Sequence, residues 1–220
     1  MTSIKTIIFD LDGTLVDSAP GIIECFQQTL RVKGIQPIIP LDSRLIGPPL
    51  RETLQCLTGI SEDDPLLGVL AEEFKSRYDS TASRTTPAYA GITSALKEIC
   101  AQGIGLHIAT NKRIIPTRQI VEHLGWNQFF ASIYARDSFS PPLKSKAQLI
   151  GCLLQEQAVD YQNAIYVGDT QEDGDAAKQN QIQFWAALWG YGQFDYLEEN
   201  SFFRTLPTTA AIVRQLAPHE

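Results

Sequence analysis

Three acidic residues lie at the ends of two apolar runs of the sequence. The run IKTIIFD ends at Asp10, Asp12 follows two residues later, and the run NAIYVGD ends at Asp169. Carboxylates brought together repel one another, and a hard divalent cation such as Mg2+ relieves this repulsion because it prefers oxygen ligands. A carboxylate beside such a cation can attack a phosphorus atom and form an aspartyl-phosphate. The pattern therefore favours phosphoryl chemistry at a Mg2+ site.

Further residues suited to this chemistry lie close to the acids or at the end of another run. Asp12 follows Asp10 on a turn, where it can protonate a leaving-group oxygen and later accept a proton from water. Gly13 lets the backbone approach a phosphate closely. Thr110 and Asn111, which end the run IGLHIATN, add two uncharged hydrogen-bond donors. A lysine is still needed to hold the phosphate and offset its charge.

The apolar runs predict the elements that must position these side chains. Runs without alternation suit strands buried on both faces of a parallel sheet, and four are found: IKTIIFD, IGLHIATN, FASIYARD and NAIYVGD. Helical stretches separate them, so we expect an α/β fold with a doubly wound parallel sheet. Ligands of such sheets gather at the carboxyl ends of the strands. The acids and the donors should therefore share one edge.

One long segment breaks the alternation of strands and helices. Between Asp17 and about Pro87 the chain carries helical patterns interrupted by Gly and Pro, and this is too long for a loop in a compact domain. We therefore expect a helical domain at residues 16–85, inserted into a core formed by residues 1–15 and 86–220. Asp17, with Ser18, is expected to cap the first inserted helix.

Composition limits the partners. The chain has 220 residues, 44% of them apolar, and a net charge of -7, which disfavours binding to nucleic acid. Four cysteines form no C-x-x-C pair, and no run has the length of a membrane span or the pattern of a signal peptide. We expect a cytoplasmic protein, monomer or homodimer, whose partner is a small phosphorylated metabolite, with no nucleic acid and no membrane.

Four segments, in this order, resemble the haloacid dehalogenase superfamily of Mg2+-dependent phosphohydrolases. They are FDLDGTLVDS at 9–18, ATN at 109–111, a lysine within 144–146 and VGDTQEDGDAA at 167–177. The resemblance covers nearly the whole chain. It implies a Rossmann-like core, and the helical segment matches the position of the helical cap of that superfamily.

The resemblance also implies roles for individual residues. Asp10 would be the nucleophile and Asp12 the general acid and base. Asp10, the backbone carbonyl of Asp12, and Asp169 would bind Mg2+, and Asp173 would be a supporting acid. Thr110, Asn111 and a lysine would bind phosphate. That lysine is either Lys146, which we prefer because it directly precedes an apolar-periodic helix, or Lys144.

Within the superfamily the segments DGTLVDSAP, IGPPL at 46–50 and LWGYG at 188–192 resemble phosphoglycolate phosphatase-like members. A phosphatase acting on a small phosphomonoester is therefore expected. A sugar phosphomutase similar to β-phosphoglucomutase, a pyrophosphatase and a non-enzymatic phospholigand-binding protein are the alternatives. Gly47 lies in a segment that would face the site, and Arg51 would contact either an anionic substrate group or solvent.

Overall fold

The sheet of the computed structural model, which describes residues 4–192, 194 and 202–217, contains six parallel strands in the order β3-β2-β1-β4-β5-β6. The strands are β1 (Thr6–Phe9), β2 (Gly105–Thr110), β3 (Phe130–Ala135), β4 (Ala164–Gly168), β5 (Gln183–Ala187) and β6 (Phe203–Leu206). The first four coincide with the predicted runs. The strand order reverses between β1 and β4, and this switch point is where ligands bind in doubly wound sheets.

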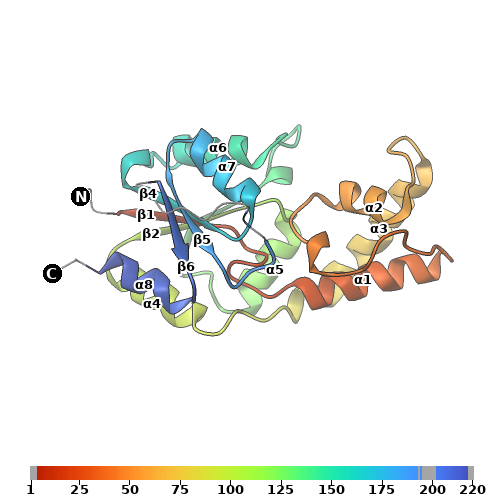
Figure 1. Cartoon of the computed structure of the whole chain (residues 1–220), viewed down its shortest axis with the longest axis horizontal. Helices are drawn as coiled ribbons and strands as arrows, with labels where there is room; N and C mark the ends of the chain where they lie inside the picture. The colour runs from red at the N-terminus through yellow and green to blue at the C-terminus, as the bar shows by residue number, and fades with distance from the viewer. Residues whose placement is uncertain (1–3, 193, 195–201, 218–220) are drawn as a thin grey trace.

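Helices cover both faces of the sheet, as Figure 1 shows. One face is packed by α4 (Ile92–Ala101), α5 (Ile114–His123) and α8 (Ala210–Leu216), and the other by α6 (Lys146–Glu156) and α7 (Gln171–Gln179). Each face has its own apolar cluster, so the strands are buried on both sides. The predicted doubly wound α/β core is confirmed. Among the described residues, no helix is long and apolar enough to cross a membrane.

Residues 16–85, which we call the helical insert, lie beside the carboxyl ends of the strands (Figure 1). They contain α1 (Ala19–Val32), η1 (Ser43–Leu45), α2 (Leu50–Thr58), α3 (Pro65–Ser80) and η2 (Ala82–Arg84). Their buried apolar side chains form a cluster distinct from the two clusters of the sheet. Phe26 of α1 packs on Phe74 of α3 with 4.4 Å between ring centres. These observations support the predicted division into domains, which stays a prediction.

The two connections between the sheet core and the insert lie side by side. Val16 forms an antiparallel bridge with Ala88, and the Asp17 N–H donates to the carbonyl of Pro87 at 3.0 Å. The insert therefore leaves the core and returns to it at almost the same place.

The prediction that Asp17 caps the first inserted helix is wrong. Ser18 occupies the N-cap position, and its side chain makes no capping hydrogen bond. The Ala19 N–H instead donates to the hydroxyl of Tyr191 at 2.9 Å, and that hydroxyl donates to Asp17 at 2.7 Å. A tyrosine distant in sequence therefore takes over the capping role that the local pattern assigned to Asp17.

Candidate active site

Three of the predicted acids meet at the switch point of the sheet. Asp10 directly follows β1 and Asp169 directly follows β4, and these two strands are paired from Thr6↔Ala164 to Phe9↔Val167. Carboxylate oxygens of Asp10, Asp169 and Asp173 lie within 4.8 Å of one another, and all three residues are buried. We call these three residues the acid cluster.

Asp169 is oriented by hydrogen bonds from two loops. Its Oδ1 accepts from the Thr14 hydroxyl at 3.1 Å, and its Oδ2 accepts from the N–H groups of Tyr191 at 2.8 Å and Gly192 at 3.3 Å. Gly13 has a φ of +81°, and a Cβ at this position would overlap the Asp169 carboxylate. The absence of a side chain at Gly13 therefore makes room for Asp169, and the expected approach of the backbone to a phosphate stays a prediction.

Asp173 is held by the first turn of α7. Its Oδ2 accepts from the N–H of Thr170 at 3.0 Å, from the Thr170 hydroxyl at 2.8 Å and from the N–H of Asp169 at 3.1 Å. The Thr170 hydroxyl in turn accepts from the Asp173 N–H, which completes a capping box. Since Oδ2 has these donors, Oδ1 is the oxygen that faces a lysine.

That lysine is Lys146. Lys146 is the first residue of α6, whose N-cap Ser145 accepts from the Gln148 N–H, and its side chain is buried. The Nζ lies 2.5 Å from Asp173 Oδ1 and 3.3 Å from Asp10 Oδ1. The side chain of the alternative, Lys144, is exposed. The structure therefore brings Lys146 to the acid cluster and leaves Lys144 outside it.

The acid cluster is short of positive charge. Burial raises the pKa of Asp10 to about 8, against the opposing effect of the Lys146 ammonium, and the neighbouring acids raise it further. Burial, together with Asp173, also raises the pKa of Asp169 to about 6. Burial would lower the pKa of Lys146, but Asp10 and Asp173 outweigh it and raise that pKa well above its usual value. One ammonium group faces three buried carboxyl groups.

A divalent cation fits this donor set. Asp10 Oδ1 is buried without a hydrogen-bond partner, although the Lys146 ammonium lies within ion-pair distance. Carboxylate oxygens are the ligands that Mg2+ prefers. A cation beside Asp10 and Asp169 would satisfy the orphaned oxygen and offset the excess negative charge.

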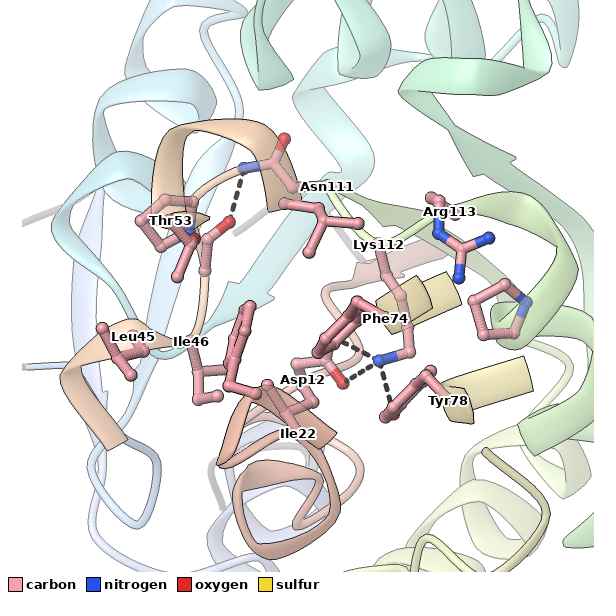
Figure 2. A pocket seen from close by; sticks show the side chains of 15 residues that line it. Asp12, Ile22, Leu45, Ile46, Thr53, Phe74, Tyr78, Asn111, Lys112 and Arg113 are labelled. Carbon is pink, nitrogen blue, oxygen red and sulfur yellow. Dashed lines mark hydrogen bonds and ion pairs between the residues drawn. The ribbon is translucent and has the colours of Figure 1, made fainter. Parts of the chain in front are cut away.

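The Asp12 side chain is not part of the acid cluster. Its two oxygens accept from Lys112 Nζ at 3.0 and 3.1 Å, and the same Nζ contacts the Tyr78 hydroxyl of α3 at 2.8 Å, as Figure 2 shows. Burial would lower the pKa of Lys112, but Asp12 and Tyr78 raise it. Lys112 was not among the predicted site residues, although it directly follows Thr110 and Asn111 at the same edge of the sheet.

The two predicted uncharged donors are arranged differently. Thr110 ends β2 and is buried, and its hydroxyl accepts from the Lys112 N–H at 3.2 Å. The Asn111 amide donates to the Gly47 carbonyl at 3.3 Å and to Glu172 at 2.9 Å. Because these bonds lead to protein groups, Asn111 ties the helical insert to α7 here, and its role in phosphate binding stays a prediction.

A cleft with a volume of about 80 Å³ lies between the insert and the core (Figure 2). Asp12 and Asn111 line it from the core, and Gly47 lines it from the insert, as expected for a segment facing the site. Most of the apolar wall of the cleft comes from the insert, and it includes Ile22, Phe26, Leu45, Ile46 and Phe74. Arg51 is exposed and donates to the Glu62 carbonyl, so it does not face this cleft.

Comparison with known proteins defines the class. Residues 7–187 match the model of the haloacid dehalogenase-like hydrolase family, and the chain belongs to this family. It is 31% identical over 217 residues to a protein named tyrosine-protein kinase PtkA from Mycobacterium tuberculosis, covering 96% of this chain and 71% of that protein. It is 29% identical to a phosphoglycolate phosphatase from Rhodobacter capsulatus, covering 84% of each chain.

A solved structure agrees with this assignment. The haloacid dehalogenase-like family protein SP0104 from Streptococcus pneumoniae superposes with a TM-score of 0.81 at 28% identity, covering 99% of this chain and 100% of that one. The resemblance to phosphoglycolate phosphatase-like members, expected from the sequence, is confirmed by the curated relatives of that name. The family and these relatives support a phosphatase enzyme.

Proposed function

We propose that this protein is a Mg2+-dependent phosphatase that hydrolyses a small, phosphoglycolate-like phosphomonoester through an aspartyl-phosphate on Asp10. The observation that carries the proposal is the acid cluster with Lys146, buried at the switch point of the sheet. The relatives named phosphoglycolate phosphatase support the choice of substrate class.

Three groups of the chain would hold the Mg2+ ion: the carboxylates of Asp10 and Asp169 and the backbone carbonyl of Asp12. When bound, the ion supplies positive charge that lets an anionic phosphate approach a carboxylate. Asp173 acts beside them as a supporting acid, because its own oxygens are already held by Thr170, Asp169 and Lys146.

The remaining residues perform two steps. In the first, an Asp10 carboxylate oxygen attacks phosphorus and the bond to the substrate oxygen breaks, while Asp12 donates a proton to that oxygen. In the second, Asp12 accepts a proton from water as the water attacks the aspartyl-phosphate, which releases phosphate and frees Asp10. Lys146, Thr110 and Asn111 bind the phosphoryl oxygens, and the helical insert acts as a cap that excludes water during the first step.

The setting of the enzyme is part of the proposal. We propose a cytoplasmic enzyme, because its four cysteines are all free. The net charge of -7 supports a small phosphorylated metabolite as partner rather than nucleic acid or a membrane surface. We propose a monomer or a homodimer, which sedimentation of the purified protein would distinguish.

The central test is hydrolysis by the Asp10→Asn variant. The wild type with Mg2+ should release p-nitrophenol from p-nitrophenyl phosphate, and phosphate from one or more members of a panel that includes phosphoglycolate, pyrophosphate and a sugar 1-phosphate. Asp10→Asn should abolish turnover. Asp175→Asn, which alters an exposed aspartate on α7, serves as the matched control and should keep it. Near wild-type turnover by Asp10→Asn would refute the mechanism, and an isomeric sugar phosphate as product would indicate a mutase.

The relative named tyrosine-protein kinase favours a second candidate, transfer of the phosphoryl group to an acceptor hydroxyl instead of water. Both reactions need a phosphoryl-binding site, so the products decide between them. Incubation with ATP, Mg2+ and a tyrosine-containing peptide, followed by mass spectrometry, measures transfer. Phosphopeptide formed faster than phosphate is released from any member of the panel would favour the second candidate.

A further inference from the structure

Lys112 lines the cleft with a buried ammonium group and has no role in the proposed steps. The Lys112 side chain is 6% exposed, and its ammonium contacts both oxygens of Asp12 and the hydroxyl of Tyr78. The Nζ also lies 4.4 Å from the centre of the Tyr78 ring. Lys112 belongs to the core, whereas Tyr78 belongs to α3 of the helical insert. One ammonium thus joins the proposed general acid to the insert (Figure 2).

We propose that Lys112 is a positioning residue that holds the Asp12 carboxylate toward the cleft, and that Tyr78 of the helical insert keeps Lys112 in place. This inference rests on the proposed function, because it concerns the residue that protonates the leaving group. It extends that function by making the alignment of Asp12 depend on contact between the insert and the core.

The geometry supports this role in two ways. The Asp12 side chain is 12% exposed, so water offers it few alternative partners, and its described side-chain hydrogen bonds come from Lys112. Removal of its cation leaves a buried carboxylate with an uncompensated charge. We expect such a side chain to turn toward solvent. Lys112 and Asp12 both line the cleft, where the leaving group of a bound ester would lie.

Tyr78 supplies the connection to the insert. Its ring is buried and stacks on Phe74 with 5.7 Å between ring centres, so the hydroxyl is held at a defined place on α3. When the insert moves away from the core, Lys112 loses this contact and the Asp12 carboxylate loses a rigidly held partner. Asp12 is therefore aligned best while the cleft is closed over the substrate.

The chain offers a matched control in the next residue. The Arg113 guanidinium makes two hydrogen bonds to Asp79, at 2.9 and 2.5 Å, and Asp79 follows Tyr78 on α3. Arg113 therefore also joins the core to the same helix of the insert, but none of its described hydrogen bonds or ion pairs reaches Asp12. A loss of activity shared by variants of Lys112 and Arg113 would indicate impaired docking of the insert on the core. A loss found only in variants of Lys112 would indicate that Asp12 is misaligned.

The test compares two esters that differ in their need for an acid. Release of p-nitrophenolate needs little protonation, whereas the alkoxide of an alkyl ester such as phosphoglycolate needs a proton from Asp12. Lys112→Met should lower kcat for phosphoglycolate about tenfold or more beyond its effect on p-nitrophenyl phosphate, because general acid catalysis contributes roughly 100-fold to 10,000-fold. Arg113→Met should change both values of kcat by the same factor.

Two further variants keep the test decisive if Lys112→Met folds poorly. Lys112→Arg retains a cation and should restore part of the alkyl-to-aryl ratio, and Tyr78→Phe should lower that ratio while keeping the ring. An unchanged ratio in Lys112→Met and Tyr78→Phe would overturn the inference while the wild type still hydrolyses both esters. A wild type that hydrolyses neither ester would instead overturn the proposed function, and the inference with it.

Discussion

The raised pKa of Asp10 predicts that the metal-free protein loses stability as the pH rises. Burial gives this carboxyl group a pKa of about 8 in the folded protein, compared with 3.8 ordinarily. The folded state therefore holds the proton more tightly than the unfolded state. The resulting stabilisation is complete below pH 3.8 and is lost progressively up to about pH 8.

The expected loss is large enough to measure. Within this window each pH unit lowers the free energy of unfolding by at most about 1.4 kcal/mol, so the step from pH 5 to pH 7 costs at most about 3 kcal/mol. Domains of this kind have total stabilities of about 5–15 kcal/mol. Asp169, with a pKa of about 6, acts in the same direction up to that pH. The Asp10→Asn variant cannot ionise at this position. Of the two pH-dependent losses of stability, it should retain only the one due to Asp169.

Urea denaturation in EDTA at pH 5, 6, 7 and 8, followed by circular dichroism, measures the effect. The quantity of interest is the difference between the wild type and Asp10→Asn at each pH. Other groups cancel in this difference, including His107, whose pKa is lowered by burial. The variant should gain stability relative to the wild type as the pH rises. A variant whose stability follows that of the wild type in parallel between pH 5 and pH 7 would refute the reasoning.

Four further outcomes are expected. Mg2+ should raise the melting temperature of the wild type more at pH 8 than at pH 5, and should do so much less in Asp10→Asn; equal shifts would contradict the assigned ligands. Lys146→Met should cost about 3–5 kcal/mol at pH 8, because it leaves buried carboxylates without their cation, and less at pH 5, as urea titrations would show. Gly13→Ala should weaken Mg2+ binding in calorimetry, because Gly13 has a φ of +81° and an added Cβ would displace the Asp169 carboxylate. An unchanged affinity would contradict the role of Asp169 as a ligand. Tyr191→Phe should lower the free energy of unfolding by about 1–3 kcal/mol, through loss of the two hydrogen bonds of its hydroxyl.

The sequence was informative where a site residue is attached directly to a strand. Asp10 and Asp169 end apolar runs, and the topology of a parallel sheet brings such positions to one edge whatever their separation along the chain. Lys146 was recognisable because it begins a periodic helix. In each case the local pattern that forms the element also places the side chain.

Prediction failed where a side chain chooses between distant partners. Asp12 pairs with Lys112, a residue 100 positions away, and Tyr78 completes the contact only because the helical insert docks on the core. The same holds for Asp17, where a hydroxyl from a distant loop displaced the expected cap. The strands β5 (Gln183–Ala187) and β6 (Phe203–Leu206) were also not predicted. They are as long as β4 and β1, but neither ends in a polar residue suited to the proposed chemistry.

The pairing of Val16 with Ala88 has a consequence for the modular construction of the chain. The insert leaves the core and returns to it through adjacent backbone segments. Relative to the sheet core it is therefore a long loop whose two ends are held together. The entropic cost of closing such a loop depends only weakly on its length. Helical segments of other sizes can therefore be exchanged between these two positions without shifting β1 or Asp10, which directly follows it. The part of the molecule that would contact the leaving group can thus be replaced, while the proposed nucleophile stays in place.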